Sequence, residues 1–184
     1  TPLLASISSP GNVGISPADA NNPLTAAQLQ ELAAIVNAQV AVLQGLGIDK
    51  IVLLSHLQQF SEEQALAPLL TGVDVIVAGG SDTRLADNTD VLRPGDVAEG
   101  QYPFLSAGTD GAPVLVVSTD GNFSYVGRLV VQFDANGEII TSGLNAGSAA
   151  AAAGTCSASW SSAGAIRTGA TGASTTTRST RCSG

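Results

Sequence analysis

The sequence predicts an α/β fold in which helices and mixed sheets form layers. Between positions 25 and 77 a helical pattern, an aliphatic run, a second helical pattern and a second aliphatic run follow one another. This is the order of a right-handed parallel crossover. From Val91 onward, shorter strand patterns are separated by Pro and Gly, which predicts a further, antiparallel sheet. With 184 residues, 44% of them hydrophobic, the chain is long enough for one domain with a substantial core.

The first predicted element is a helix over residues 25–46. Thr25 and Gln28 form a capping-box pattern, in which each side chain satisfies a free backbone N–H at the start of the helix. Apolar residues then recur at helical spacing and glycines supply the stop: Leu29, Leu32, Ala33, Val36, Val40, Leu43, Gly45 and Gly47. We therefore expect an amphipathic helix that covers one face of a sheet.

A shorter second helix is predicted over residues 61–70. Ser61 stands at the expected N-cap position, where its hydroxyl can accept a backbone N–H. Glu62 and Glu63 fall in the first turn, where negative charge interacts favourably with the helix dipole.

Branched aliphatic residues mark the predicted strands. The runs over residues 51–54 and 73–77 are short and end in small or polar residues. Such runs are typical of parallel strands that are covered on both faces. Further strands are predicted over residues 113–118, 125–133 and 138–141, the last two joined by a turn at residues 134–137.

Charge is distributed unevenly along the chain. All 15 acidic residues lie before position 143, together with only four basic residues, which gives residues 1–142 a net charge of −11. Such an acidic body argues against binding to a nucleic-acid polymer, which needs a positive surface. It is compatible with divalent cations, although solubility alone also explains an acidic surface.

We expect no membrane span and no signal peptide within this sequence. It contains no run of 18 apolar residues, and no basic segment followed by an apolar one at its start. Because the chain begins at Thr1 rather than at Met, we expect a processed or partial polypeptide.

Residues 143–184 differ in kind from residues 1–142, and we place the domain boundary between them. Ala, Gly, Ser and Thr make up 33 of these last 42 residues, too little apolar surface for a separate core. We expect the tail either to be ordered by a second polypeptide or to differ in true sequence, which peptide mass spectrometry would decide. Cys156 and Cys182 lie here; a disulfide between them would stabilise the fold by roughly 3 kcal/mol, and their spacing fits no zinc motif.

Polar residues that can carry chemistry follow the first two predicted strands. His56, the single histidine of the sequence, comes directly after the first of them, and Asp82 follows the second. Ligands of parallel sheets gather outside the carboxyl ends of the strands. The pattern therefore places His56 and Asp82 where a metal or substrate would bind.

The segments Leu-Leu-Ser-His at residues 53–56 and Val-Ile-Val-Ala-Gly-Gly-Ser-Asp-Thr at residues 75–83 resemble the calcineurin-like metallophosphoesterases. The similarity is strongest to the branch of the 5'-nucleotidases and related bacterial alkaline phosphatases. It continues, in the same order, through residues 102–104, 111–117 and 125–134. The resemblance implies the carboxyl-terminal half of a layered αββα sandwich, and a periplasmic or secreted protein.

The resemblance implies that His56 is a metal ligand, because it matches the family's Leu-Ser-His motif. In the second motif, Gly-Gly-His-Ser-His-Thr in the family, the two histidines fall on Gly80 and Asp82. Gly80 offers no side chain. Asp82 can still ligate a metal, and a carboxylate favours calcium, magnesium or manganese over zinc. The alternative is that Ser81 and Asp82 only cap the next turn.

Related nucleotidases place a loop close to this site, and here it matches the segment Thr-Asp-Gly-Asn at residues 119–122. The resemblance makes Asp120 and Asn122 candidate substrate-binding residues, although the same segment is also an ordinary turn sequence. Arg84 and Arg128 are candidates to approach a phosphate, and Arg128 is equally suited to an ion pair.

The family's other ligand motifs, an earlier Asp-x-His, a Gly-Asp and a Gly-Asn-His, do not occur ahead of His56 in this sequence. We therefore expect a fragment or subunit of a metal-dependent phosphatase that acts on phosphate monoesters such as nucleotides. A second polypeptide would supply the amino-terminal half and complete a centre of two divalent metals, which together activate water and hold the phosphoryl oxygens. The alternative is a noncatalytic binding or assembly module on the same scaffold.

A serine hydrolase is disfavoured, because Ser55 and His56 point to opposite faces of a strand.

Overall fold

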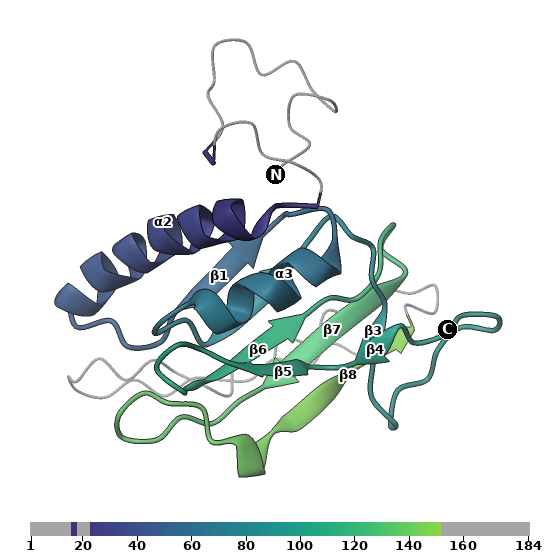
Figure 1. The fold of residues 1–184 in the computed structure, drawn as a ribbon. Coiled ribbons are helices and arrows are strands. Elements are labelled where there is room, and N and C mark those ends of the chain that lie inside the picture. Colours follow the sequence, from purple (N-terminus) through teal and green to yellow (C-terminus); the bar gives the residue numbers. More distant parts are fainter. Residues whose placement is uncertain (1–15, 18–22, 152–184) are drawn as a thin grey trace. The chain divides into compact units, whose positions relative to one another are not determined.

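The computed structural model describes residues 16–17 and 23–151, which are built around a four-stranded mixed sheet (Figure 1). Its strands lie in the order β1 (Val52–Ser55), β2 (Val75–Ala78), β6 (Pro113–Val117) and β5 (Phe104–Ala107). β1, β2 and β6 are parallel, and β5 runs antiparallel to β6. The predicted α/β class with mixed sheets is confirmed. The strands β1, β2 and β6 lie within two residues of their predicted bounds.

The long helix α2 (Ala26–Gly45) covers one face of this sheet together with α3. Its capping box forms as predicted: Thr25 Oγ1 accepts the Gln28 N–H at 3.3 Å, and Gln28 Oε1 accepts the Thr25 N–H at 3.0 Å. By length and composition α2 is apolar enough to cross a membrane. A core helix of a globular domain passes the same test, and α2 does place Ala33 and Val40 in the core.

The second helix is shorter than predicted and begins differently. α3 (Phe60–Leu66) has Gln59 at its N-cap position, so the predicted cap at Ser61 is wrong. A 3₁₀ turn, η1 (Ala67–Leu69), follows, because Pro68 has no N–H to continue the α-helical hydrogen bonds. The predicted acidic first turn is present, but Glu62 and Glu63 are buried rather than solvated.

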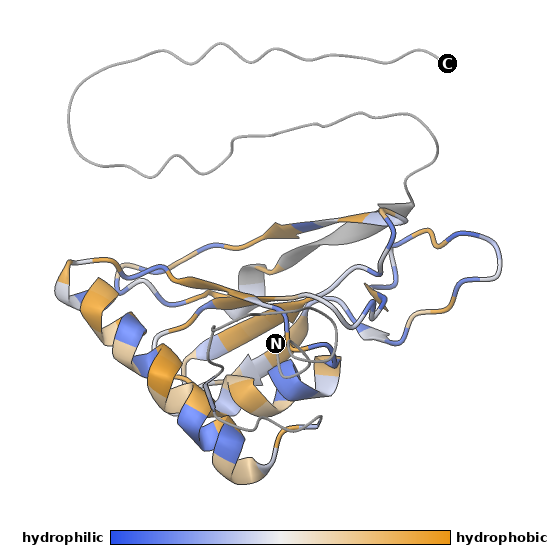
Figure 2. Cartoon of the chain, turned by 90° about the horizontal axis from the view of Figure 1, so that it is seen from above, coloured by the Kyte–Doolittle hydropathy of each residue, from blue (hydrophilic) through white to orange (hydrophobic). Residues whose placement is uncertain are grey.

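A second sheet packs on the opposite face of the four-stranded sheet, so that helices, sheet and sheet form successive layers (Figure 2). It consists of β7 (Tyr125–Val130) and β8 (Asn145–Ala151), which are antiparallel, as predicted for this half of the chain. The predicted strand over residues 138–141 is absent from the described structure. Phe133 and Ile139 make one isolated bridge there, and the 3₁₀ turn η2 (Thr141–Gly143) follows.

Three features lie outside the predicted pattern, and the first is the strand β5 of the main sheet. β3 (Leu85–Ala86) and β4 (Gly100–Gln101) form a short parallel pair beside the main sheet. β8 lies within the first residues of the predicted tail, and the compact unit extends to Ala151. Residues 152–184, with Cys156 and Cys182, lie outside the described residues.

The two faces of the four-stranded sheet are not equally covered. On the helical face, Ile76 and Val116 are fully buried under α2 and α3. On the other face, Leu115 is fully buried, whereas Val52 and Leu54 of β1 are 57% and 77% exposed. The prediction of strands covered on both faces is therefore wrong for β1. The second sheet has only two strands, whereas the main sheet has four. The apolar residues of the second sheet pack over β6 and β2.

Candidate functional site

The carboxyl ends of β1, β2 and β6 meet at one edge of the sheet and bring the predicted site segments together. His56 follows β1, and Gly79 and Gly80 follow β2, with the Gly79 N–H donating to the Ser55 carbonyl at 3.0 Å. The segment after β6 is joined to the segment after β2 by the Asp120 N–H, which donates to the Thr83 carbonyl at 3.1 Å. Segments more than 60 residues apart in the sequence thus share one site.

His56 is exposed and lies against the two glycines that follow β2. A Cβ atom at Gly80 would lie 2.9 Å from His56 Nε2, and one at Gly79 would lie 3.2 Å from Nδ1. Gly80 also has φ of +90°, a backbone conformation that residues with a side chain rarely adopt. The imidazole therefore packs against the backbone of the two glycines. Gly80, which stands where the family motif has a histidine, is thus directly beside His56.

A buried carboxylate holds both neighbours of His56. Glu63 Oε1 accepts the Ser55 hydroxyl at 2.6 Å and the Leu57 N–H at 3.2 Å. The Glu63 side chain is fully buried, and its Oε2 has no hydrogen-bond partner among the described residues. Burial raises the pKa of Glu63, although the hydrogen bonds from Ser55 and Leu57 oppose this. The sequence indicated only a helix-dipole role for Glu63, because nothing in it shows that α3 lies under this strand end.

Asp82 is exposed and lies next to the segment that follows β6. It adopts φ of +53°, and a Cβ atom at Gly121 would come within 2.9 Å of both of its carboxylate oxygens. Ser81 Oγ accepts the Thr83 N–H at 3.3 Å, so Ser81 does stabilise the turn. The Asp82 carboxylate thus packs against the Asp120–Asn122 turn.

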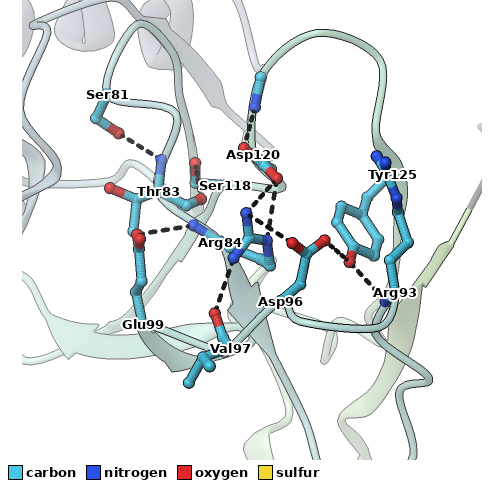
Figure 3. Close-up of polar contacts among 11 residues, drawn as sticks. Ser81, Thr83, Arg84, Arg93, Asp96, Val97, Glu99, Ser118, Asp120 and Tyr125 are labelled. Atoms are coloured by element: carbon cyan, nitrogen blue, oxygen red, sulfur yellow. Dashed lines mark hydrogen bonds and ion pairs between the residues drawn. The ribbon is translucent and has the colours of Figure 1, made fainter.

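Arg84 and Asp120 form an ion pair with each other (Figure 3). Arg84 donates from Nε at 3.0 Å and from Nη2 at 2.7 Å to the same oxygen, Asp120 Oδ2. Desolvation alone would raise the pKa of Asp120, but the hydrogen bonds from Arg84 and from the Gly121 N–H hold it below its usual range. The hydrogen bonds that Arg84 donates to Asp120 raise the pKa of Arg84. Two of the three predicted substrate-binding residues, Arg84 and Asp120, therefore neutralise each other's charge.

Arg84 also fixes the neighbouring loop. Its Nη1 donates to the Val97 carbonyl at 3.0 Å, and Nη2 lies 3.7 Å from Asp96 Oδ1 (Figure 3). Asp96 in turn accepts the Tyr125 hydroxyl at 2.5 Å, and the Arg84 guanidinium lies over the Tyr125 ring. One arginine thus joins the ends of β2 and β6, the loop at residues 93–99 and β7.

The turn after β6 is conformationally unusual. Asp120, Asn122 and Phe123 all have positive φ, at 83°, 56° and 57°. Such values are uncommon for residues other than glycine and are enriched at functional sites. Asn122 is exposed at the top of this turn, and the adjacent Phe123 is 99% exposed. Arg128, by contrast, is an exposed residue within β7.

A pocket of about 470 Å³ lies between the four-stranded sheet and β7. Its polar part is formed by Asp82, Ser118, Thr119 and Asp120, beside Gly79 and Gly80. Its apolar part is formed by Val75, Val77, Val117 and Leu129. Tyr102 also lines it, and burial raises the pKa of Tyr102 to about 12, so its hydroxyl stays protonated at neutral pH.

A complete metal centre is not formed by these side chains. Within the described ranges 16–17 and 23–151, no three His, Cys, Asp or Glu residues group closely enough to hold a metal ion. His56 has a glycine beside it, and Asp82 lies against the Gly121 backbone. The donors present here therefore do not fit a metal centre by themselves.

Known proteins with similar sequences are described as 5'-nucleotidases. The chain is 34% identical to 5'-nucleotidase of Bos taurus over 122 residues, covering 66% of this chain and 21% of that protein. It is 40% identical to snake venom 5'-nucleotidase of Crotalus adamanteus over 100 residues, 54% of this chain and 16% of that one. No protein-family model matches the chain.

Among solved structures, the 5'-nucleotidase precursor of Thermus thermophilus superposes with a TM-score of 0.52 at 38% identity, covering 57% of this chain and 20% of the other. The matched part of this chain is a 5'-nucleotidase-like metallophosphoesterase. It corresponds to a carboxyl-terminal region of that catalytic domain, and its layers form a partial α/β sandwich. The NAD nucleotidase of Haemophilus influenzae has the same TM-score, 0.52, at 28% identity, covering 59% of this chain and 19% of the other. The chain spans about a fifth of the length of these relatives.

Proposed function

We propose that this chain is part of a metal-dependent phosphatase that hydrolyses phosphate monoesters, with nucleotides as substrates. The observation that supports this most is the position of His56, at the strand end that meets Gly80, Asp82 and the Asp120–Asn122 turn beside a pocket. The 5'-nucleotidase-like sequence surrounds this arrangement. A strand-end site of this kind is where ligands of parallel sheets bind.

His56 is proposed as one metal ligand, because its imidazole is exposed at the end of β1. Asp82 is proposed as a second, since its carboxylate is exposed at the neighbouring strand end. The other ligands of a two-metal centre would come from the part of the catalytic domain that this chain does not span. The metal identity stays open among calcium, magnesium, manganese and zinc.

Asn122 and Asp120 are proposed to contact substrate from the turn after β6. Because Asp120 already neutralises Arg84, we assign Arg84 to holding this turn in place beside the pocket rather than to binding a free phosphate. We further propose a periplasmic or secreted location and no nucleic-acid polymer as partner. The acidic charge of residues 1–142 supports the last point.

Metal content and phosphate release test this proposal. The isolated 184-residue chain, given Mg²⁺, Mn²⁺, Zn²⁺ or Ca²⁺ and AMP, is expected to release no phosphate above background. Joined to the remaining part of a 5'-nucleotidase catalytic domain, it is expected to bind metal and turn over AMP, and His56→Ala is expected to abolish both. An active complex that is indifferent to His56→Ala would contradict the assignment.

A noncatalytic binding or assembly module is the second candidate. The observation that favours it is Gly80, which places a bare backbone where the second motif would carry a ligand beside His56. In that case the complete assembly would contain no stoichiometric metal. Metal analysis of the assembly therefore separates the two candidates.

A further inference from the structure

Gln58 is a polar residue beside His56 that the sequence motifs did not single out. It follows the end of β1 by three positions and is half-buried. A Cβ atom at Gly80 would lie 2.9 Å from His56 Nε2 and 3.2 Å from Gln58 Nε2. The imidazole of His56 and the carboxamide of Gln58 therefore lie next to the same point over the Gly80 backbone.

The backbone conformation at Gln58 is one that favours glycine. Its φ is +76°, in the left-handed region that residues with a side chain rarely adopt. The neighbouring residues hold it there, because the Leu57 N–H donates to buried Glu63 Oε1 at 3.2 Å and Gln59 is the N-cap of α3. Backbone strain of this kind clusters at sites that bind ligands or carry out chemistry. A glutamine rather than a glycine at this position therefore indicates a role for the side chain.

The carboxamide of Gln58 can supply a donor that Gly80 lacks. Gly80 stands where the family motif has a histidine, so the end of β2 presents no side chain beside His56 at this point. A carboxamide oxygen is a common ligand of hard divalent cations. Half a turn of the carboxamide exchanges Nε2 and Oε1, so the oxygen can take the position next to His56. Gln58 thus brings an oxygen donor to the place that the second motif leaves without one.

We propose that Gln58 is a metal ligand of this site, and that its amide oxygen binds the same divalent cation as His56. The ligand comes from the segment after β1 and replaces one that the segment after β2 no longer carries. This proposal rests on the proposed function, and it adds a residue to the metal site that neither motif contains.

The chemistry of the donors narrows the metal. With Gln58 the proposed set has one imidazole and two oxygen donors, the second being the carboxylate of Asp82. Carbonyl and carboxylate oxygens suit magnesium, manganese and calcium, whereas zinc sites are richer in nitrogen and sulfur. Manganese accepts imidazole as well as oxygen ligands and is therefore the probe of choice. The net charge of −11 over residues 1–142 favours any cation at this site.

Metal affinity tests the proposal. The full 184-residue chain, joined to the remaining part of the catalytic domain, is titrated with Mn²⁺ in a calorimeter. Gln58→Leu keeps the size of the side chain and removes its oxygen, and we expect the affinity to fall at least about tenfold. Gln58→Glu keeps an oxygen donor and is expected to bind at least as tightly as the wild type. Gln39→Ala is the matched control, because Gln39 is exposed on α2, and it should leave the affinity unchanged.

Stability separates a ligand from a structural residue. The midpoint of thermal unfolding of the metal-free chain is expected to stay within about 2 °C for Gln58→Leu. Gln58→Gly is a second variant that removes the oxygen, and it relieves the backbone strain because glycine adopts φ of +76° readily. We expect Gln58→Gly to fold and to lose Mn²⁺ affinity to the same extent. A residue that only packed against His56 would show the opposite pattern, a loss of stability without a loss that depends on the oxygen.

Each outcome decides one claim. Mn²⁺ bound with equal affinity by the wild type and Gln58→Leu, but not by His56→Ala, would overturn this proposal and leave the proposed function standing. A loss in Gln58→Leu that Gln58→Glu does not restore would also overturn it, because Gln58 would then act by packing. No metal in the wild-type complex would overturn the proposed function together with this ligand.

Discussion

The contact between Ser55 and Glu63 gives the sharpest stability prediction, because a carboxylate with no solvent access depends on it. The Ser55 hydroxyl donates to Glu63 Oε1 at 2.6 Å, and the second carboxylate oxygen has no partner among the described residues. A hydrogen bond to a charged group contributes about 1.5–3 kcal/mol, against about 0.5–1.5 kcal/mol for a neutral pair. Ser55→Ala is therefore expected to lower the free energy of unfolding by about 2 kcal/mol at pH 8.

The same substitution in a Glu63→Gln background is expected to cost about 1 kcal/mol, because the acceptor is then neutral. Urea unfolding of the four proteins measures the coupling energy, expected at about 1 kcal/mol. Ser61→Ala is the matched control, since Ser61 is exposed in α3, and its effect should stay within about 0.5 kcal/mol. A coupling energy below about 0.3 kcal/mol would refute the reasoning.

The pH dependence of stability follows from the same group. The pKa of Glu63 is raised by burial, so the folded state holds this proton more tightly than the unfolded chain does. The contribution of Glu63 to stability is then fully present below its ordinary value of 4.5 and is lost as the pH rises through the folded value. Glu63→Gln should remove this decline in thermal unfolding scans. A decline that is unchanged in the variant would show that Glu63 is not its source.

Three further predictions concern the site. Gly80→Ala is expected to destabilise the fold by about 1–3 kcal/mol in urea unfolding, because φ is +90° and the new Cβ would lie 2.9 Å from His56 Nε2. Gly95→Ala is the control, because Gly95 has a similar φ of +92° but no neighbouring atoms. The difference between the two variants gives the cost of the contact with His56, apart from the cost of backbone strain. His56→Ala is expected to leave the thermal midpoint within about 2 °C, since the side chain is exposed; a larger loss would assign His56 to the fold. Asp120 has a lowered pKa, so the stabilisation by its ion pair is fully present above the ordinary value of 3.8 and is lost as the pH falls through the lower folded value. Asp120→Asn should therefore weaken the loss of stability on acidification, and an identical acid transition would contradict the role of the Arg84 pair.

Local signals in the sequence predicted the local parts of the fold. The capping box of α2 needs only Thr25 and Gln28, three positions apart, and it forms as predicted. The aliphatic runs located β1, β2 and β6 closely, because short runs of branched aliphatic residues are typical of parallel strands. The start of α3 was predicted wrongly, because Ser61 is favourable at an N-cap, whereas the observed N-cap is Gln59, two residues earlier, and the adjacent Glu62 and Glu63 are buried.

Long-range pairings could not be predicted in this way. β8 consists mainly of small residues and has no strand signal of its own, and it is defined by its pairing with β7. Likewise, Arg84 and Asp120 were each predicted to contact substrate, and the sequence contains no sign that these residues, 36 positions apart, bind each other. The exposure of Leu54 had no signal either, because the same aliphatic run suits a covered strand and an uncovered one.

The central claim is that His56 supplies one ligand to a divalent metal centre that this chain forms only together with the rest of a phosphoesterase domain. The most direct measurement is the metal content of the 184-residue chain, alone and in complex with that remaining part, for the wild type and for His56→Ala. The account predicts no stoichiometric metal in the isolated chain, bound metal in the wild-type complex and its loss in the variant. Metal bound equally by the wild-type and variant complexes, or phosphate release from AMP by the isolated chain, would contradict it.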